Sequence, residues 1–255
     1  MKLEGKTAVV TGAASGMGRE TCGELIQAGT NVLAIDLHEE KLMALCQGLG
    51  CHAAYAIADV TDPRAVELAV TKAIEQFGAI NICVNCAGMP AADKTVGRDG
   101  LPQALETFRR VVDVNLNGTF NVLRLCAAAM VKNSPEDGER GVIINTSSGA
   151  AQDGQAGQAA YSASKAGVEA LALPIARDLA AYGIRVNTIS PGLFDTTMVG
   201  GLPEKVRDSL INMVLFPKRM GQPADYAHLV RHIIENAYMN TSVIRLDAGI
   251  RLAAK

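Results

Sequence analysis

The sequence lacks most of the features that mark a secreted, membrane-spanning or nucleic-acid-binding protein. Its 24 basic and 26 acidic residues almost cancel, so the formal charge is only -2 and there is no basic excess for nucleic acid. No apolar run reaches the roughly 20 residues that cross a bilayer. The opening MKLEGKTAVV enters a β-branched segment at once and contains neither a signal sequence nor an arginine-rich transit peptide. We expect a cytoplasmic protein with neither nucleic acid nor membrane as partner, although an uncleaved internal signal for an organelle remains open.

The cysteines also lack the dense spacing of a secreted disulfide scaffold, so reduced thiols are expected. Cys83 and Cys86 form a CxxC, but residues three apart on a strand point to opposite faces. No second CxxC or histidine pair completes a zinc site, and no metal is predicted. The six cysteines are Cys22, Cys46, Cys51, Cys83, Cys86 and Cys126.

Short β-branched runs alternate with helical segments almost from end to end. Asp62 and Pro63 supply an N-cap and a first-turn proline for one of these helices. The alternation implies right-handed crossovers and a parallel sheet with helices on both faces, so residues 1–255 are predicted to form one α/β domain. The expected strands are 7–11, 31–36, 53–59, 80–85, 141–147, 184–190 and 242–247.

Two segments interrupt the alternation. Residues 89–103 are polar and rich in glycine and proline, which predicts a loop. Residues 193–222 are longer than a usual connection and contain an amphipathic helix around 203–215. Because long ordered connections are often lids, we interpret residues 193–222 as a segment that covers the substrate. Packing of this helix onto the core would explain its apolar residues equally well.

A glycine-rich turn follows the first strand and opens the first helix. Glycines there permit a tight turn and close approach to a diphosphate, and the helix N-terminus offers free N–H donors. The spacing is GxxxGxG, which meets the general dinucleotide pattern only approximately. The residues expected to bind the cofactor are Gly12, Ser15, Gly16, Met17 and Gly18.

Asp36 ends the second strand, at about the distance from the glycine turn where a carboxylate binds adenosine ribose hydroxyls. A 2′-phosphate at that place would be repelled by a few kcal/mol. Ser15 provides no cation to offset the repulsion, so NAD is predicted over NADP. A helix-capping role for Asp36 is the alternative.

Tyr161 and Lys165 are four residues apart, which places both on one face of a helix. A tyrosine that exchanges protons at neutral pH needs its pKa lowered by about three units, or roughly 4 kcal/mol. An ammonium about 4 Å away supplies roughly that energy at an effective dielectric of about 20. The pair therefore predicts an acid/base group, and a chance pair on a helix surface is the alternative.

These motifs together resemble those of the short-chain dehydrogenase/reductase family over essentially the whole chain. The family's TGxxxGxG is found at 11–18 and its YxxxK at 161–165, and its NNAG is here Asn85-Cys86-Ala87-Gly88, with cysteine as a departure. The resemblance implies an adenine-pocket acid and a segment lining the nicotinamide carboxamide. It therefore adds these cofactor residues: Asp59, Val60, Asn85, Cys86, Ala87, Gly88, Tyr161, Lys165, Pro191, Gly192, Phe194 and Thr196.

The resemblance also implies the catalytic residues. Tyr161 is the expected proton acceptor, Ser148 holds the substrate oxygen, Lys165 lowers the phenol pKa and binds ribose hydroxyls, and Asn115 holds a water leading to solvent. The alternatives are that Ser148 only caps a turn and that Asn115 is an ordinary polar residue of a helix.

The implied fold is a doubly wound, Rossmann-type sheet in the order 3-2-1-4-5-6-7, in a homotetramer. Segments such as GVIINTSS, GQAAYSASK and SPGLF are similar to the branch of the family that converts (S)-3-hydroxyacyl-CoA to 3-oxoacyl-CoA. The enzyme alternatives are a 3-oxoacyl carrier-protein reductase and a hydroxysteroid or sugar-alcohol dehydrogenase. The alternative of another class is a nucleotide-binding scaffold without catalysis.

Overall fold

The structure is a computed structural model that describes residues 1–196 and 204–253. Within these residues, one seven-stranded parallel sheet has the order β3-β2-β1-β4-β5-β6-β7, which confirms the predicted order. Most strand residues are buried, as expected for a parallel sheet covered on both faces. The strands are β1 (Thr7–Thr11), β2 (Asn31–Asp36), β3 (Ala53–Ile57), β4 (Ile82–Asn85), β5 (Gly141–Thr146), β6 (Ile184–Pro191) and β7 (Val243–Leu246).

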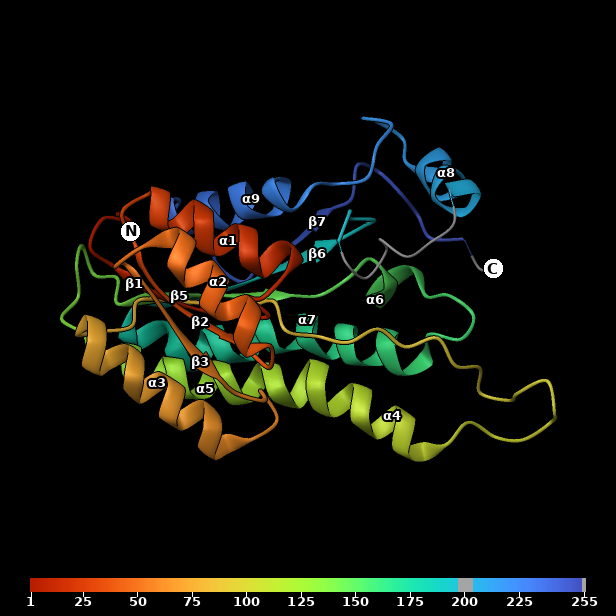
Figure 1. The fold of residues 1–255 in the computed structure, drawn as a ribbon, viewed down its shortest axis with the longest axis horizontal. Helices are drawn as coiled ribbons and strands as arrows, with labels where there is room; N and C mark the ends of the chain where they lie inside the picture. The colour runs from red at the N-terminus through yellow and green to blue at the C-terminus, as the bar shows by residue number, and fades with distance from the viewer. Residues whose placement is uncertain (197–203, 254–255) are drawn as a thin grey trace.

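Helices cover both faces of the sheet (Figure 1). Side chains of α1 (Gly16–Gln27), α2 (Glu39–Leu49) and α9 (Pro223–Glu235) form one core with alternate strand residues. Side chains of α3 (Pro63–Phe77), α5 (Gly118–Met130) and α7 (Ala159–Leu179) form the other. This division shows the single doubly wound domain that the alternation predicted. The remaining helical segments are α4 (Leu105–Val112), η1 (Asp113–Asn117), α6 (Ala150–Asp153), η2 (Ala180–Tyr182) and α8 (Glu204–Met213).

Local sequence signals account for several helix boundaries. The Asp62 side chain accepts hydrogen bonds from the main-chain N–H groups of Arg64 and Ala65, and Pro63 occupies the first turn of α3. Pro174 lies inside α7, which nevertheless continues to Leu179. None of the helices in the described ranges combines the length and apolar character needed to span a bilayer.

α4, η1 and α5 form one continuous helix whose hydrogen-bond pattern changes in the middle. α4 leads into a π-helical turn, η1, and the chain then continues as α5. A π turn closes hydrogen bonds over five residues instead of four, and such turns are frequent at functional sites. Asn115 lies within η1 and is fully buried. The predicted catalytic asparagine is therefore carried by an irregular turn.

The two irregular segments lie where the sequence places them. Residues 89–103 form a loop with a short bridge between Val96 and Pro102. The predicted helix around 203–215 is α8, which begins at Glu204 and ends at Met213. Residues 197–203 of the predicted substrate-covering segment lie outside the described residues.

Candidate functional site

The predicted site residues gather at the carboxyl edge of the sheet. They follow or end six strands, β1 to β6, and are joined there by Asn115 of η1 and by Tyr161 and Lys165 of α7. Because all strands are parallel, their carboxyl ends meet at this one edge, where open α/β sheets bind their ligands. Residues more than 100 positions apart in the sequence thus form one site.

The glycine turn is closely packed against the neighbouring strand end. Gly12 and Gly16 have φ angles of +65° and +51°, which favour glycine. A Cβ on Gly12 would lie 2.8 Å from the main-chain nitrogen of Ala87, and one on Gly18 would collide with the carbonyl oxygen of Gly12. Among the described residues, the Ser15 side chain caps none of the first N–H groups of α1. Gly16, Met17 and Gly18 therefore offer donors and space that fit a diphosphate.

Asp36 faces this turn from the end of β2. One carboxylate oxygen accepts the N–H of Ala14 at 3.1 Å, and the other accepts that of Leu37 at 2.8 Å. The N-cap position of α2 is occupied by His38, so the helix-capping alternative for Asp36 does not hold. The carboxylate is thus fixed beside the glycine turn.

Asp59 and Val60 follow β3. The Asp59 carboxylate accepts hydrogen bonds from both the main-chain N–H and the hydroxyl of Thr61. Val60 is buried, its carbonyl accepts the Asn121 side chain, and a Cβ on Gly118 would collide with its side chain at 2.5 Å. These contacts hold the predicted adenine-side residues in one conformation.

The end of β4 carries Asn85, Cys86, Ala87 and Gly88. Ala87 donates its N–H to the Thr11 hydroxyl at 3.1 Å, which ties the end of β4 to the glycine turn. The Asn85 amide donates to Asn145 at 2.9 Å. Burial raises the pKa of the Cys86 thiol, so it is a neutral group here.

Tyr161 and Lys165 lie on one face of α7, as their spacing predicts. The Lys165 Nζ lies 5.8 Å from the centre of the Tyr161 ring and donates to the carbonyl oxygen of Thr146 at 2.9 Å. Burial lowers the pKa of Lys165 to about 8. Burial raises the pKa of Tyr161, and a hydrogen bond with Ser148 opposes that rise.

This arrangement corrects one prediction from the sequence. Lys165 was expected to depress the pKa of the Tyr161 phenol, but the pKa of Tyr161 is raised and Lys165 is not among its causes. The physical reason is burial of both groups: the ammonium itself is desolvated and hydrogen-bonds a carbonyl oxygen. In the chain alone, Tyr161 is therefore protonated at neutral pH.

The Asn115 side chain, on η1, approaches Gly88, as the Lys165 ammonium does. Its Oδ1 accepts the N–H of Met89 at 2.8 Å, and its Nδ2 donates to the carbonyl of Met89 and to the Ser164 hydroxyl. A Cβ on Gly88 would lie 3.2 Å from the Asn115 Oδ1 and 3.3 Å from the Lys165 Nζ. The amide oxygen and the ammonium therefore both lie close to Gly88, whose lack of a side chain leaves them room.

The segment after β6 closes the site. Gly192 donates its N–H to the carbonyl of Leu246, and Phe194 is buried. A Cβ on Gly16 would touch the Thr196 side chain at 3.3 Å. The predicted residues Pro191 to Thr196 therefore end against the glycine turn, 180 positions earlier in the chain.

The sequence did not reveal the residues that support the site from behind. Tyr226 of α9 is fully buried and shares a 2.7 Å hydrogen bond with the Thr146 hydroxyl, while its hydroxyl accepts the Cys86 thiol. Tyr226 lies on an apolar helix face with Ala227 and Val230, so its only sequence signal was that of a core residue.

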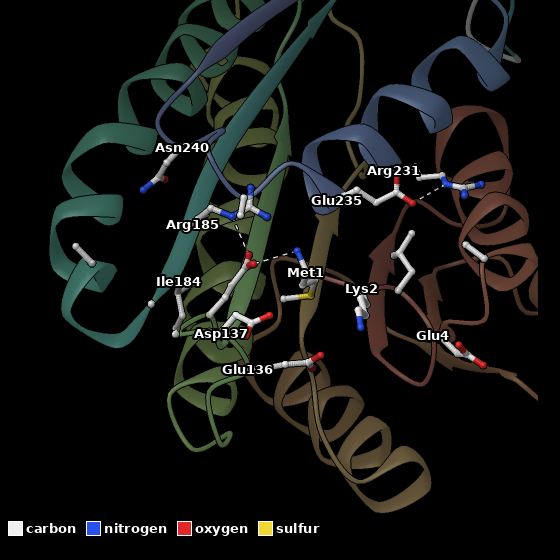
Figure 2. A pocket seen from close by; sticks show the side chains of 17 residues that line it. Met1, Lys2, Glu4, Glu136, Asp137, Ile184, Arg185, Arg231, Glu235 and Asn240 are labelled. Atoms are coloured by element: carbon white, nitrogen blue, oxygen red, sulfur yellow. Dashed lines mark hydrogen bonds and ion pairs between the residues drawn. The ribbon is translucent and has the colours of Figure 1, made fainter.

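One hollow lies at the opposite edge of the sheet, and a smaller one lies beside the predicted cofactor residue Phe194. The first, of about 1060 Å³, is at the amino edge of the sheet, where the Met1 amine and Arg185, both labelled in Figure 2, each pair with Glu139. Another of about 210 Å³ is lined by residues that include Phe194, Val214 and Leu246. Within the described part of the chain, no group of three or more His, Cys, Asp or Glu side chains could hold a metal ion.

Comparison with known proteins agrees with this geometry. The short chain dehydrogenase model matches residues 6–207. A 3-hydroxyacyl-CoA dehydrogenase type-2 of Homo sapiens is 51% identical over 98% of this chain and 97% of its own length. A 3-oxoacyl-[acyl-carrier-protein] reductase of Thermotoga maritima is 35% identical over 98% of this chain and 99% of its own.

A solved structure is similar over the whole fold. The crystal structure of 3-hydroxyacyl-CoA dehydrogenase type-2 from Mycobacterium avium has a TM-score of 0.95 and 39% identity, and covers 98% of both chains. The family model covers well over half of the sequence, and these relatives cover nearly all of it. This chain therefore belongs to the short-chain dehydrogenase family.

Proposed function

We propose that this protein is an NAD-dependent oxidoreductase that interconverts (S)-3-hydroxyacyl-CoA and 3-oxoacyl-CoA. The observation that carries the proposal is the meeting of Ser148, Tyr161 and Lys165 with a glycine turn at one sheet edge. The names of the human and mycobacterial relatives support the acyl-CoA substrate.

Asp36 supports NAD as the cofactor. Its carboxylate is fixed beside the glycine turn by the N–H groups of Ala14 and Leu37, so it cannot turn away without losing both bonds. Ribose hydroxyls can donate to such a carboxylate, whereas a 2′-phosphate would be repelled. The first N–H groups of α1 would hold the diphosphate.

Tyr161 is the acid/base group in this mechanism. NAD, when bound, supplies the hydride acceptor for alcohol oxidation. The Tyr161 hydroxyl lies within hydrogen-bonding reach of Ser148, so both can hold the same substrate oxygen. In ketone reduction, protonated Tyr161 donates its proton to that oxygen; in oxidation, it must first be deprotonated. We therefore expect oxidation to become faster, and reduction slower, as the pH rises.

Lys165 and Asn115 complete the proton route. Because its pKa is about 8, Lys165 can gain and lose a proton near neutral pH. Its ammonium would bind the nicotinamide ribose hydroxyls beside the phenol. Asn115, whose amide oxygen lies close to Gly88 as the ammonium does, would hold the water that connects Lys165 to solvent.

The described parts of residues 193–222 support a role in covering the substrate. α8 buries none of its side chains, and Val206 is 42% exposed. In Figure 1, α8 stands away from the sheet, near its carboxyl edge. A helix that was held only by core packing would bury its apolar face. Closure over a bound acyl chain would bury it.

We also propose a homotetramer in the cytoplasm, with neither nucleic acid nor membrane as a partner. Phe120 of α5 and Leu173 of α7 are 44% and 45% exposed, and a partner subunit would cover them. The six cysteines are all free, which suits a reducing compartment. Light scattering and cell fractionation test these two proposals.

The proposed reaction is tested by following NADH oxidation with acetoacetyl-CoA. The same assay is repeated with NADPH, with a 3-oxoacyl carrier protein and with a steroid ketone. We expect the highest kcat/KM with NADH and acetoacetyl-CoA. Activity with NADPH alone would overturn the cofactor assignment, a preference for another ketone would overturn the substrate, and no turnover at all would favour a scaffold.

A further inference from the structure

A cluster of charged residues ties three parts of the chain together beside Ser148. Arg245 of β7 donates two hydrogen bonds of 2.9 Å to the carboxylate of Asp153, which ends α6. It donates a third, of 2.7 Å, to Asp247. Asp153 also accepts the N–H of Leu252 at 2.9 Å. We define Arg245, Asp153 and Asp247 as the clamp.

The clamp is well shielded for a set of charges near the surface. The side chains of Arg245, Asp153 and Asp247 are 18%, 11% and 8% exposed. Exposed ion pairs contribute little because water and salt screen them, but paired bonds to a guanidinium in a shielded place are stronger and fix direction. The pKa of Asp153 is lowered, chiefly by its hydrogen bonds with Arg245. The pair is therefore charged at neutral pH.

The clamp acts on the segment that carries Ser148. Gly149 donates its N–H to the carbonyl of Pro191 at 2.8 Å, which fixes the segment to the end of β6. A Cβ on Gly149 would lie 3.3 Å from the Arg245 guanidinium. The Ser148 hydroxyl itself accepts the N–H of Ala150, the first residue of α6. The position of α6 thus determines where that hydroxyl points.

From this geometry we propose that Arg245 is a positioning residue, which sets the Ser148 hydroxyl through Asp153 and α6. The proposal rests on the proposed role of Ser148 in holding the substrate oxygen. A displacement of about 1 Å in a positioned group can cost about 10²-fold in rate. Loss of Arg245 should therefore lower kcat, while NADH binding, which depends mainly on the ends of β1 to β4, should change much less.

The test is a double-mutant cycle with Ser148→Ala. We expect Arg245→Met to lower kcat with acetoacetyl-CoA at least tenfold when Ser148 is present and less than twofold in the S148A background. The dissociation constant of NADH should change less than twofold in both. Arg231→Met, which breaks ion pairs with Glu24 and Glu235 elsewhere, is the matched control and should leave kcat unchanged.

An equal loss of kcat in both backgrounds would overturn the proposal, since Arg245 would then act independently of Ser148. So would an unchanged kcat in R245M. If R245M does not fold, Asp153→Asn replaces it, because this variant keeps the size of the side chain and removes its charge. If the wild type turns over no 3-oxoacyl-CoA, the proposed function fails. Amide exchange of residues 149–151, expected to be faster in R245M, then decides whether the clamp holds the segment.

Discussion

Lys165 and Arg185 are buried cations at opposite edges of the same sheet, and their surroundings differ. At the amino edge, Arg185 (labelled in Figure 2) pairs with Glu139 at 2.7 Å; it also donates to the main-chain carbonyls of Ile233 and Ile234. At the carboxyl edge, the direct hydrogen bond of Lys165 in the described chain goes to the carbonyl of Thr146, and its pKa falls to about 8.

The difference separates a structural charge from a functional one. A paired, fully hydrogen-bonded cation is fixed in its charge state and holds elements together. A cation buried without a carboxylate partner remains able to lose its proton and to bind a new partner. Arg185, which holds elements of the fold together, therefore has a carboxylate partner, whereas Lys165, which is proposed to take part in the reaction, has none among its direct hydrogen bonds in the described chain.

The largest expected effect is on catalysis at the carboxyl edge. Tyr161→Phe removes the only group proposed to exchange a proton with substrate, so kcat should fall by about 10³-fold, equivalent to about 4 kcal/mol. NADH binding and the unfolding transition should be retained. Steady-state kinetics measures the change, with Tyr238→Phe, at a fully exposed tyrosine, as control. Wild-type turnover in Y161F would remove Tyr161 from the mechanism.

The next effect is on stability at the amino edge. Arg185→Met leaves Glu139, whose side chain is largely shielded from water, with the Met1 amine as its remaining ion-pair partner, and it removes donors to several carbonyls. Removing one partner of a buried ion pair costs about 3 to 5 kcal/mol of unfolding free energy. Urea denaturation checks this value. Arg64→Met breaks an exposed pair with Glu67 and should cost less than about 1 kcal/mol; similar losses in both variants would contradict the comparison.

A smaller effect is expected on cofactor choice. Asp36→Ser removes the carboxylate that would repel a 2′-phosphate by a few kcal/mol, so the ratio of kcat/KM for NADH over NADPH should fall about 10²-fold. Asp62→Ser removes one carboxylate near the same edge and keeps a helix cap, and its ratio should stay the same. An unchanged ratio in D36S would mean that another group excludes NADPH.

The smallest effect is a gain in stability at the carboxyl edge. The pKa of Lys165 is lowered from 10.5 to about 8, so the charged lysine costs about 3 kcal/mol below pH 8. The cost shrinks as the pH rises from 8 to 10.5, because the folded chain has by then released the proton. Lys165→Met also loses the bond to Thr146, so we expect a net gain of about 1 to 2 kcal/mol at pH 7.

Urea denaturation at pH 7 and near pH 10.5 measures this gain, which should disappear at the higher pH. Lys41→Met, at an exposed position, should show no such pH dependence. A loss of stability at pH 7 in K165M would mean that Lys165 is held as firmly as Arg185. At pH 7, the unfolding free energy should rise in K165M and fall in R185M, so these two variants test the comparison most directly.

Local signals made much of the fold predictable. The Asp62 cap, the glycine turn and the Tyr161–Lys165 spacing each depend on residues close in sequence, and the structure places all three as expected. Strand ends were less accurate: the third strand ends at Ile57 instead of residue 59, and the fourth begins at Ile82 instead of residue 80. Pairing with neighbouring strands sets those limits, and a single strand does not encode it.

The supporting residues of the site could not be predicted in this way. Arg245 meets Asp153 across 92 positions, and Tyr226 meets Thr146 across 80. Neither pair has a local pattern, since both depend on how strands and helices are ordered in space. The protonation state of Tyr161 also depends on burial, which spacing alone does not determine.

The π turn at Asn115 lets one rod present two different faces. An extra residue in a turn advances every later side chain by roughly 100° around the axis. α4 can therefore lie against α7, while α5 packs on α3 and on the strands, although no loop separates the two helices. Shortening η1 by one residue would rotate α5 about its axis and turn other side chains toward the core. The π turn that carries Asn115 therefore also determines which residues of α5 are buried.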